Sequence, residues 1–158
     1  MLKLVGVKKT LGTQPVLRGV DLTIPAGKLT TIIGRSGEGK SVLLKHMIGL
    51  LQPDEGQVWV GDVDISRLRG QPLNEVRKRF AMLFQGAALF DSMSVFENVA
   101  FGLRVRKWPD QKVRERVMEL LRLVRLEEKA PLSPANLSGG QKQRIALVRA
   151  LAPEPKVL

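Results

Sequence analysis

The chain of 158 residues contains no cysteine and no tyrosine, and aromatic residues make up only 4% of it. The absence of cysteine rules out a disulfide-stapled fold and fits a reducing compartment, although such a chain can occur anywhere. The scarcity of aromatic rings leaves few stacking platforms for single-stranded nucleic acid. No apolar run approaches the roughly 18 residues of a membrane span, and the first ten residues show no secretory signal.

Basic residues dominate the charge of the chain. There are 26 Lys and Arg against 15 Asp and Glu, which gives a net charge of +11. This excess fits a solvated basic surface, a nucleic-acid partner, an anionic membrane surface or a phosphate ligand, and charge alone does not choose among them. The length predicts one domain, and a hydrophobic content of 44% is enough for a substantial core.

Hydrophobic periodicity alternates between the patterns of strands and helices. Alternating or β-branched apolar runs predict strands at 2–7, 20–25, 28–34, 57–62 and 80–85. Apolar residues at helical spacing predict helices at 40–51, 94–106, 110–124 and after 138. Residues 153–158 are expected to form a loop and the first residues of a strand. This order predicts an α/β fold with a helical insertion near 90–135.

A glycine-rich loop follows the predicted strand at 28–34 and precedes a predicted helix. Gly34, Gly39, Lys40 and Ser41 match G-x-x-x-x-G-K-[ST], whose backbone N–H groups and helix start form an anion site. Lys40 would reach the β- and γ-phosphates, and the Ser41 hydroxyl would ligate Mg²⁺. The expected nucleotide contacts are Gly34, Arg35, Ser36, Gly37, Glu38, Gly39, Lys40, Ser41 and Val42. The Glu38 side chain, an unusual negative charge here, is expected to point to solvent.

A second glycine pair stands where another helix should begin. Gly139 and Gly140 precede the helix-favouring run IALVRAL, although each glycine costs a helix roughly 1 kcal/mol relative to alanine. Ser138 and Gln141 have the spacing of a capping box, so the segment could simply begin a helix. A capping box gains nothing from the glycines, however. A helix start without side chains suits an anion that must approach backbone N–H groups closely.

These residues resemble a known family. Residues 137–141 spell LSGGQ, the signature of ABC-type ATPases, and 16–41 resembles the start of an ABC nucleotide-binding domain. MLFQ at 82–85 resembles the Q-loop of that family, with Gln85 as its glutamine. The resemblance covers the whole chain. It implies a P-loop NTPase (RecA-like) core with an antiparallel β part and a helical subdomain.

The resemblance also implies a division of the chain and a partner. The single partial domain 1–158 would comprise a β part and phosphate-loop core at 1–89, a helical subdomain at 90–137, and the signature helix with the next strand at 138–158. ATP and Mg²⁺ would be the cofactors of a head-to-tail homodimer. Each ATP would lie between the phosphate loop of one subunit and Ser138, Gly139, Gly140 and Gln141 of the other.

Within this family the resemblance assigns roles to single residues. Lys40, Gln85 and Ser138 would be the catalytic residues present, with Gln85 near the attacking water. Mg²⁺ would be held by Ser41 and Gln85. The family stacks adenine on an aromatic residue where this chain has Leu11, so Leu11 and Val16 would give the base apolar contact only. Loss of the stacking face costs on the order of 1 kcal/mol.

A narrower resemblance lies at residues 86–103, GAALFDSMSVFENVAFGL. The sequence of this segment is similar to that of the ATP-binding subunit of Mla-type transporters, which move phospholipids and confer solvent resistance. It implies a lipid cargo, an integral-membrane permease that contacts about 86–103, and a cytoplasmic position on the inner face of the membrane. The same apolar side chains could instead serve as core fillers.

The family pattern continues from PKVL into a strand that carries an aspartate and a glutamate, followed later by a histidine. None of these follows Lys156 here, and the only histidine, His46, fits partly buried packing or a surface polar contact. The chain therefore reads as a piece truncated before the water-activating glutamate.

The missing general base leads to a first prediction. Loss of a general base typically costs 10² to 10⁴ in rate, so purified residues 1–158 should show negligible ATP hydrolysis. A phosphate-release assay measures this. Steady turnover that Lys40→Ala abolishes would contradict it.

Two other functions remain open at this point. A soluble ABC protein that acts on nucleic acid or ribosomes would use the excess of basic residues, although no long heptad coil separates Gln85 from Ser138. A non-hydrolysing regulatory protein is the other alternative. For the transporter subunit no nucleic-acid partner is expected.

Overall fold

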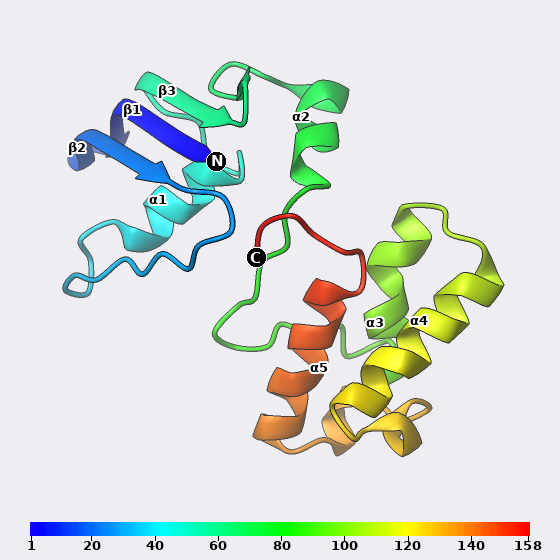
Figure 1. Cartoon of the computed structure of the whole chain (residues 1–158). Coiled ribbons are helices and arrows are strands. Elements are labelled where there is room, and N and C mark those ends of the chain that lie inside the picture. The colour runs from blue at the N-terminus through cyan, green and yellow to red at the C-terminus, as the bar shows by residue number, and fades with distance from the viewer. The chain divides into compact units, whose positions relative to one another are not determined.

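The computed structural model describes residues 1–158 and divides into two compact units, Met1–Lys78 and Arg79–Leu158 (Figure 1). The first contains an antiparallel sheet and two helices, and the second is helical apart from one isolated bridge between extended residues. This content confirms the predicted α/β class.

The sheet of the first unit has the strand order β2-β1-β3-β4, with all pairs antiparallel. Its strands are β1 (Leu2–Leu11), β2 (Gln14–Ile24), β3 (Glu55–Val60) and β4 (Val63–Asp64). Leu4 pairs with Leu22 on one side and with Val58 on the other. Alternation buries Leu2 and Leu4 of β1 and Val58 and Val60 of β3, and Val7 is also buried after a register shift between Leu4 and Val7. The predicted strands near 2–7, 20–25 and 57–62 are therefore present.

Two helices accompany this sheet. Helix α1 (Lys40–Met47) packs against β3 and buries His46, whose Nδ1 lies 2.7 Å from the Val42 carbonyl oxygen. It ends before the predicted residue 51 because Gly49 adopts a left-handed conformation with φ 68°. Helix α2 (Gly70–Arg77) carries no strong sequence signal. Arg77 anchors it by donating to the Gly49 carbonyl at 2.6 Å.

The strand predicted at 28–34 is absent, and this expectation is wrong. The segment has no ladder partner, and Leu29 and Ile33 are 96% and 90% exposed. A β-branched run becomes a buried parallel strand only if strands pair with it and helices cover both faces. In the first unit the sheet is built from other segments, so 28–34 stays extended and unpaired.

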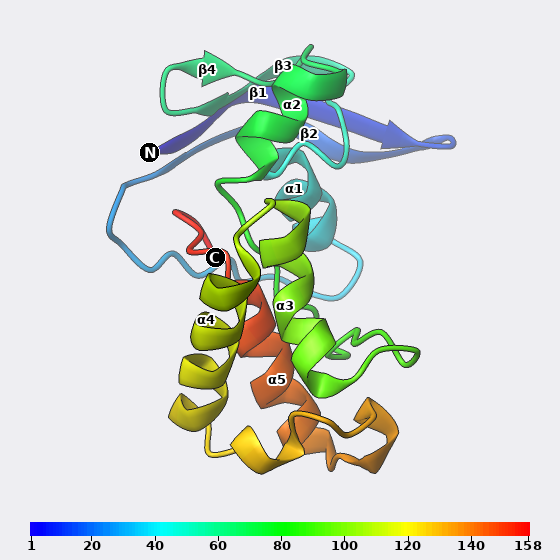
Figure 2. The same ribbon diagram turned by 90° about the vertical axis from the view of Figure 1, so that its right-hand side faces the viewer.

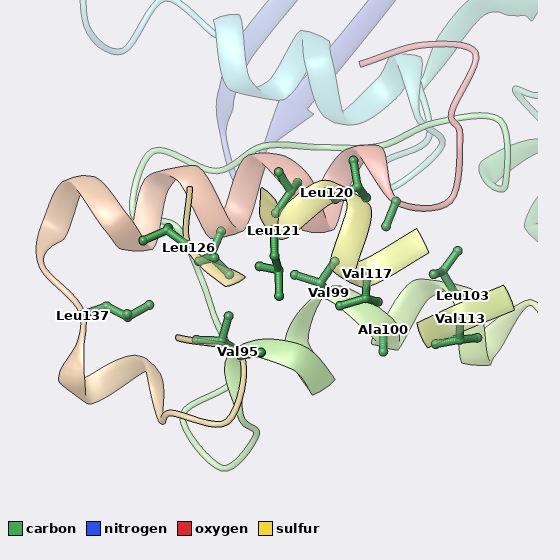
Figure 3. Packing of buried hydrophobic residues seen from close by; sticks show 14 residues of the cluster. Val95, Val99, Ala100, Leu103, Val113, Val117, Leu120, Leu121, Leu126 and Leu137 are labelled. Atoms are coloured by element: carbon green, nitrogen blue, oxygen red, sulfur yellow. The ribbon is translucent and has the colours of Figure 1, made fainter. Parts of the chain in front are cut away.

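The second unit is a packed set of helices. Helices α3 (Val95–Val105), α4 (Asp110–Leu123) and α5 (Gly139–Leu151) lie side by side, and two short 3₁₀ turns, Glu127–Lys129 and Pro134–Asn136, join α4 to α5 (Figure 2). Their apolar stripes form one core, which also takes in Leu126 and Leu137 (Figure 3). Helical spacing alone predicted the stripe on α4, of which Val113, Val117, Leu120 and Leu121 are buried.

The predicted capping box at the start of α3 is confirmed. The Ser94 hydroxyl accepts from the Glu97 N–H at 3.2 Å, and the Glu97 carboxylate accepts from the Ser94 N–H at 2.8 Å. The Ser94 N–H and the Ser94 hydroxyl both donate to the Glu97 carboxylate, and these bonds lower the pKa of Glu97 below its usual value. The box satisfies two backbone donors that a helix start otherwise leaves unpaired.

The strand predicted at 80–85 is reduced to an isolated parallel bridge between Phe80 and Val157. The Ala81 N–H donates to the Val157 carbonyl at 2.9 Å, and the Val157 N–H donates to the Arg79 carbonyl at 3.1 Å. The strand start expected near 157 is thus paired, whereas residues 82–85 belong to no strand or bridge. Every helix is too short or too polar to span a membrane.

The shared core of the second unit yields a prediction on stability. Leu121 is fully buried and Leu123 is 74% exposed, although both lie on α4. Leu121→Ala should lower the free energy of unfolding by about 2–5 kcal/mol, through lost burial and a cavity. The matched control Leu123→Ala should change it by less than about 0.5 kcal/mol. Urea denaturation measures both. Equal effects would contradict the packing of α4 on this core.

Candidate functional site

The loop at 34–41 has the backbone shape of an anion-binding turn. Gly37 and Gly39 adopt left-handed conformations with φ 85° and 86°, and helix α1 begins at Lys40 without any side-chain cap. A side chain at Gly39 would also collide with Val16, because an added Cβ would lie 2.7 Å from the Val16 Cγ1. The loop therefore requires glycine there, and strand β2 sets its position.

The two functional side chains of the loop lie at the start of α1. The Lys40 Nζ donates to the carbonyl oxygens of Gly34 and Arg35 at 2.7 and 2.5 Å, and Ser41 is exposed on the first helical turn. Ser36 and Gly37 are exposed earlier in the loop, and Val42 is half-buried. The loop thus presents an ammonium group, a hydroxyl and a helix start along one short segment.

The two residues expected beneath the base differ in their surroundings. Val16 lies against Gly39 and so borders the loop. Leu11 is exposed at the end of β1, where it pairs with Gln14 at the hairpin turn. The first unit thus brings Val16 to the phosphate loop and leaves Leu11 on the open end of the hairpin.

Glu38 does not extend into solvent as expected. The residue is exposed, but its carboxylate turns back and accepts a hydrogen bond from the Arg35 N–H at 2.7 Å. No sequence pattern predicted this contact. The carboxylate can reach that donor because the left-handed Gly37 reverses the chain between the two residues.

The start of α5 has both a capping box and an open helix start, the two alternatives that the sequence did not decide between. Ser138 and Gln141 form a complete capping box, with the Ser138 N–H donating to the Gln141 side chain at 2.8 Å. Gly139 and Gly140 have no positive φ, and an added Cβ on either would meet nothing within 4 Å. Nothing inside the second unit therefore requires glycine at these positions. The exposed helix start is open to close approach from outside.

The Gln85 segment is held on α5. Gln85 is exposed, and its carbonyl oxygen accepts from the Gln143 side chain at 2.6 Å. Arg149 donates to the carbonyl oxygens of Ala88 and Ala87 at 2.7 and 3.0 Å. Ala87 and Ala88 adopt left-handed conformations with φ 59° and 50°, respectively, which non-glycine residues avoid. The bonds from Arg149 thus fix an unfavourable turn beside Gln85.

Arg149 also borders an apolar groove. Its guanidinium lies 5.6 Å from the centre of the Phe90 ring, and partial burial lowers the pKa of Arg149 below its usual value. The Phe90 and Phe101 rings are 4.9 Å apart, and both side chains, together with Phe84, are exposed along the groove. Three large apolar side chains on one open surface are typical of a contact site.

The residues that hold this region in place were not predicted from the sequence. Asn98 is fully buried, and its side chain bonds the backbone N–H and C=O of Phe90 and the carbonyls of Met93 and Ser94. A polar amide on the apolar stripe of α3 could have signalled such a role. A lone arginine in the apolar run of α5 was the corresponding signal for Arg149.

The predicted site residues fall into two groups. Lys40 and Ser41 lie together in the first unit, and Gln85 lies with the start of α5 in the second. The predicted functional roles of these residues remain predictions.

Comparison with known proteins identifies relatives over nearly the whole chain. A family model described as "ABC transporter" matches residues 17–158. The methionine import ATP-binding protein MetN of Symbiobacterium thermophilum is 46% identical, with a match that covers 100% of this chain and 49% of that protein. The spermidine/putrescine import ATP-binding protein PotA of Haemophilus influenzae is 41% identical, with 100% and 41% covered. The chain thus spans about half the length of the curated relatives it matches.

Solved structures share the fold. A dimeric ATP-binding cassette in a post-hydrolysis state, bound to ADP and Pi, is 34% identical and superposes with a TM-score of 0.87 over 98% of this chain and 71% of that one. The cbiO1 protein of Clostridium perfringens, part of the cbiONQ complex, is 30% identical with a TM-score of 0.85, over 98% and 62%. The fold is therefore that of an ABC cassette.

The link between Arg149 and the Gln85 segment generates a prediction. Arg149→Ala should remove both hydrogen bonds to the left-handed turn and speed amide exchange around Ala88 by at least about tenfold. Exchange in the buried core of α3 and α4 should stay slow. Hydrogen exchange with mass spectrometry measures both regions.

Lys142→Ala is the matched control, because it removes a cation from the same helix at a position that does not bond the turn. Unchanged exchange around Ala88 in Arg149→Ala would contradict the role of Arg149 in holding it.

Proposed function

The chain belongs to the ABC transporter family, and from this premise we propose that it is the ATP-binding subunit of a membrane transporter. The observation that carries the proposal is the presence of two helix starts next to glycine, one after Gly39 of the phosphate loop and one at Gly139 and Gly140 after Ser138. Each start offers backbone N–H groups and the positive end of a helix dipole to an anion.

The residues of the first unit fit a nucleoside triphosphate. The left-handed glycines curve the loop, the uncapped start of α1 leaves its N–H groups free for an anion, and Lys40 supplies a positive charge. Bound ATP would place its phosphates on this loop, and Lys40 would exchange its two carbonyl partners for phosphate oxygens. Val16 would border the sugar or base from strand β2.

Mg²⁺ fits this site as a partner of the phosphates. No three His, Asp or Glu side chains gather into a metal-binding cluster, and Mg²⁺ commonly keeps several waters and takes few protein ligands beside substrate phosphates. We assign the Ser41 hydroxyl of the first unit as a protein ligand of Mg²⁺. The metal would neutralise phosphate charge, and Gln85 would orient water.

The start of α5 suits a nucleotide held by a second subunit. Because Gly139 and Gly140 face open space, an anion carried by another copy can approach their backbone N–H groups without collision. The related cassette bound to ADP and Pi is described as dimeric. We therefore infer a head-to-tail homodimer in which Ser138, Gly139, Gly140 and Gln141 contact the ATP of the opposite subunit.

The groove beside Arg149 suits a membrane partner. Phe84, Phe90 and Phe101 expose apolar surface there, within or next to the segment 86–103. We infer that an integral-membrane permease contacts this surface, so that the subunit lies on the cytoplasmic face of the membrane. The bonds from Gln143 and Arg149 would connect such a contact to Gln85.

The cargo is a narrower question. The relatives carry methionine import or spermidine/putrescine import in their names. That the cargo is a lipid remains a prediction, which depends only on the sequence of residues 86–103. Phospholipid exchange and methionine uptake, assayed in a strain that lacks the gene, would separate the two.

Mixing two inactive variants tests the proposed composite site. In the complete subunit, Lys40→Ala and Ser138→Arg should each lower ATP hydrolysis by about 10² or more, because every site then lacks one half. A mixture should form heterodimers with one intact site and regain up to about a quarter of the wild-type rate.

The control is a mixture of Lys40→Ala with the double variant, which contains no intact site. Recovery there, or none in the test mixture, would contradict the shared site. Retained nucleotide binding in Lys40→Ala would argue against the phosphate loop itself.

A further inference from the structure

The Glu38 side chain forms a clasp across the phosphate loop. Its carboxylate accepts from the Arg35 N–H at 2.7 Å, while the Glu38 N–H donates to the Arg35 carbonyl at 3.4 Å. A Cβ added to Gly34 would lie 2.5 Å from the Glu38 Oε2. The carboxylate therefore lies directly against the backbone of Gly34.

This clasp fixes a negative charge in a loop that otherwise attracts anions. The Lys40 ammonium donates to the carbonyl oxygens of Gly34 and Arg35, and no ion pair joins it to Glu38. The Glu38 carboxylate thus forms no direct ion pair with the lysine of the same loop. Like charges in close proximity repel, and the repulsion is only partly screened at low salt.

We propose that Glu38 sets the affinity of the loop for nucleotide phosphates, a role that rests on the proposed function. The hydrogen bond from Arg35 shapes the turn for binding, while the charge of the carboxylate weakens the hold on the phosphates. The balance favours release of nucleotide. Glu38 is a positioning and affinity-determining residue, and it takes no part in bond breaking.

The two effects can be separated because they respond differently to substitution. Glu38→Gln keeps an oxygen acceptor for the Arg35 N–H and removes the charge. Glu38→Ala removes both. The glutamine variant should therefore bind nucleotide more tightly than the wild type, and the alanine variant should gain less because its turn is no longer clasped.

Calorimetric or fluorescence titration of the complete subunit with ATP, ADP and AMP tests the proposal. At about 50 mM salt, Glu38→Gln should tighten ATP binding by about three- to tenfold, and the gain should fall to less than about twofold at about 500 mM salt. The gain should grow with the number of phosphates. A change in turn structure alone would show neither dependence.

The matched control is Asp62→Asn, which removes one exposed negative charge from the same unit. Asp62 lies near the end of β1 where Leu2 pairs with Val60, whereas Val16 and the phosphate loop lie toward the end where Lys9 pairs with Leu17. Those pairs are seven residues, or about 20 Å, apart along the strand. Asp62→Asn should change affinity by less than about 1.5-fold.

The possible outcomes distinguish a failure of the role of Glu38 from a failure of the proposed function. Unchanged or weaker binding in Glu38→Gln, with binding still lost in Lys40→Ala, would overturn the role of Glu38 and leave the phosphate loop standing. A larger gain in Glu38→Ala than in Glu38→Gln would overturn the clasp. A wild-type subunit that binds no nucleotide at any salt concentration would overturn both the inference and the proposed function.

Discussion

The second unit depends on the burial of one side of α5 against α3 and α4. Ile145 and Val148 are buried in this core, and other positions on the helix contribute the residues of the candidate site. Its first turn exposes two glycines, and Gln143 and Arg149 hold the Gln85 segment. A single rigid helix thus connects a candidate anion site with a candidate water-positioning loop. If the core did not form, neither would have a defined place.

The phosphate loop depends on a comparable constraint in the first unit. Its shape requires left-handed glycines, but its position is set by contact between Gly39 and Val16 of strand β2. The antiparallel sheet therefore does more than contribute a core. It places one wall of the candidate nucleotide site directly beside the start of α1. The Glu38 clasp then adds a negative charge to a loop whose other groups attract anions.

The two pairs of closely spaced glycines in the chain have different physical explanations. Gly37 and Gly39 are required by the fold, because their φ angles lie in the left-handed region and Val16 fills the space above Gly39. Gly139 and Gly140 are required by nothing in their own unit. Their helix start is already capped by Ser138 and Gln141, so a capping box and an open anion site coexist there. From the sequence, the capping box and the anion site were alternative interpretations, whereas the structure contains the geometry of both.

Local patterns predicted a large part of the fold. The stripe on α4, the capping box of α3 and the alternation in β1 depend on residues a few positions apart, so they can be read from the sequence. The segments 28–34 and 80–85 have equally good strand composition, but parallel pairing depends on distant partners. Only Phe80 finds one, at Val157. Helix α2, which has a weak pattern, is held by the contact from Arg77 to Gly49.

The sequence by itself determined the family, the phosphate loop and the residue types of the second helix start, because these are contiguous motifs whose chemistry follows from spacing. Only the tertiary structure decided which side chains meet from distant positions. The contacts of Arg149 with Ala87 and Ala88 span about 60 residues, and Val16 reaches Gly39 from another element. The direction of the Glu38 carboxylate also required the folded loop, since it depends on the left-handed turn at Gly37. Such contacts arise from the path of the chain in space, which no short pattern encodes.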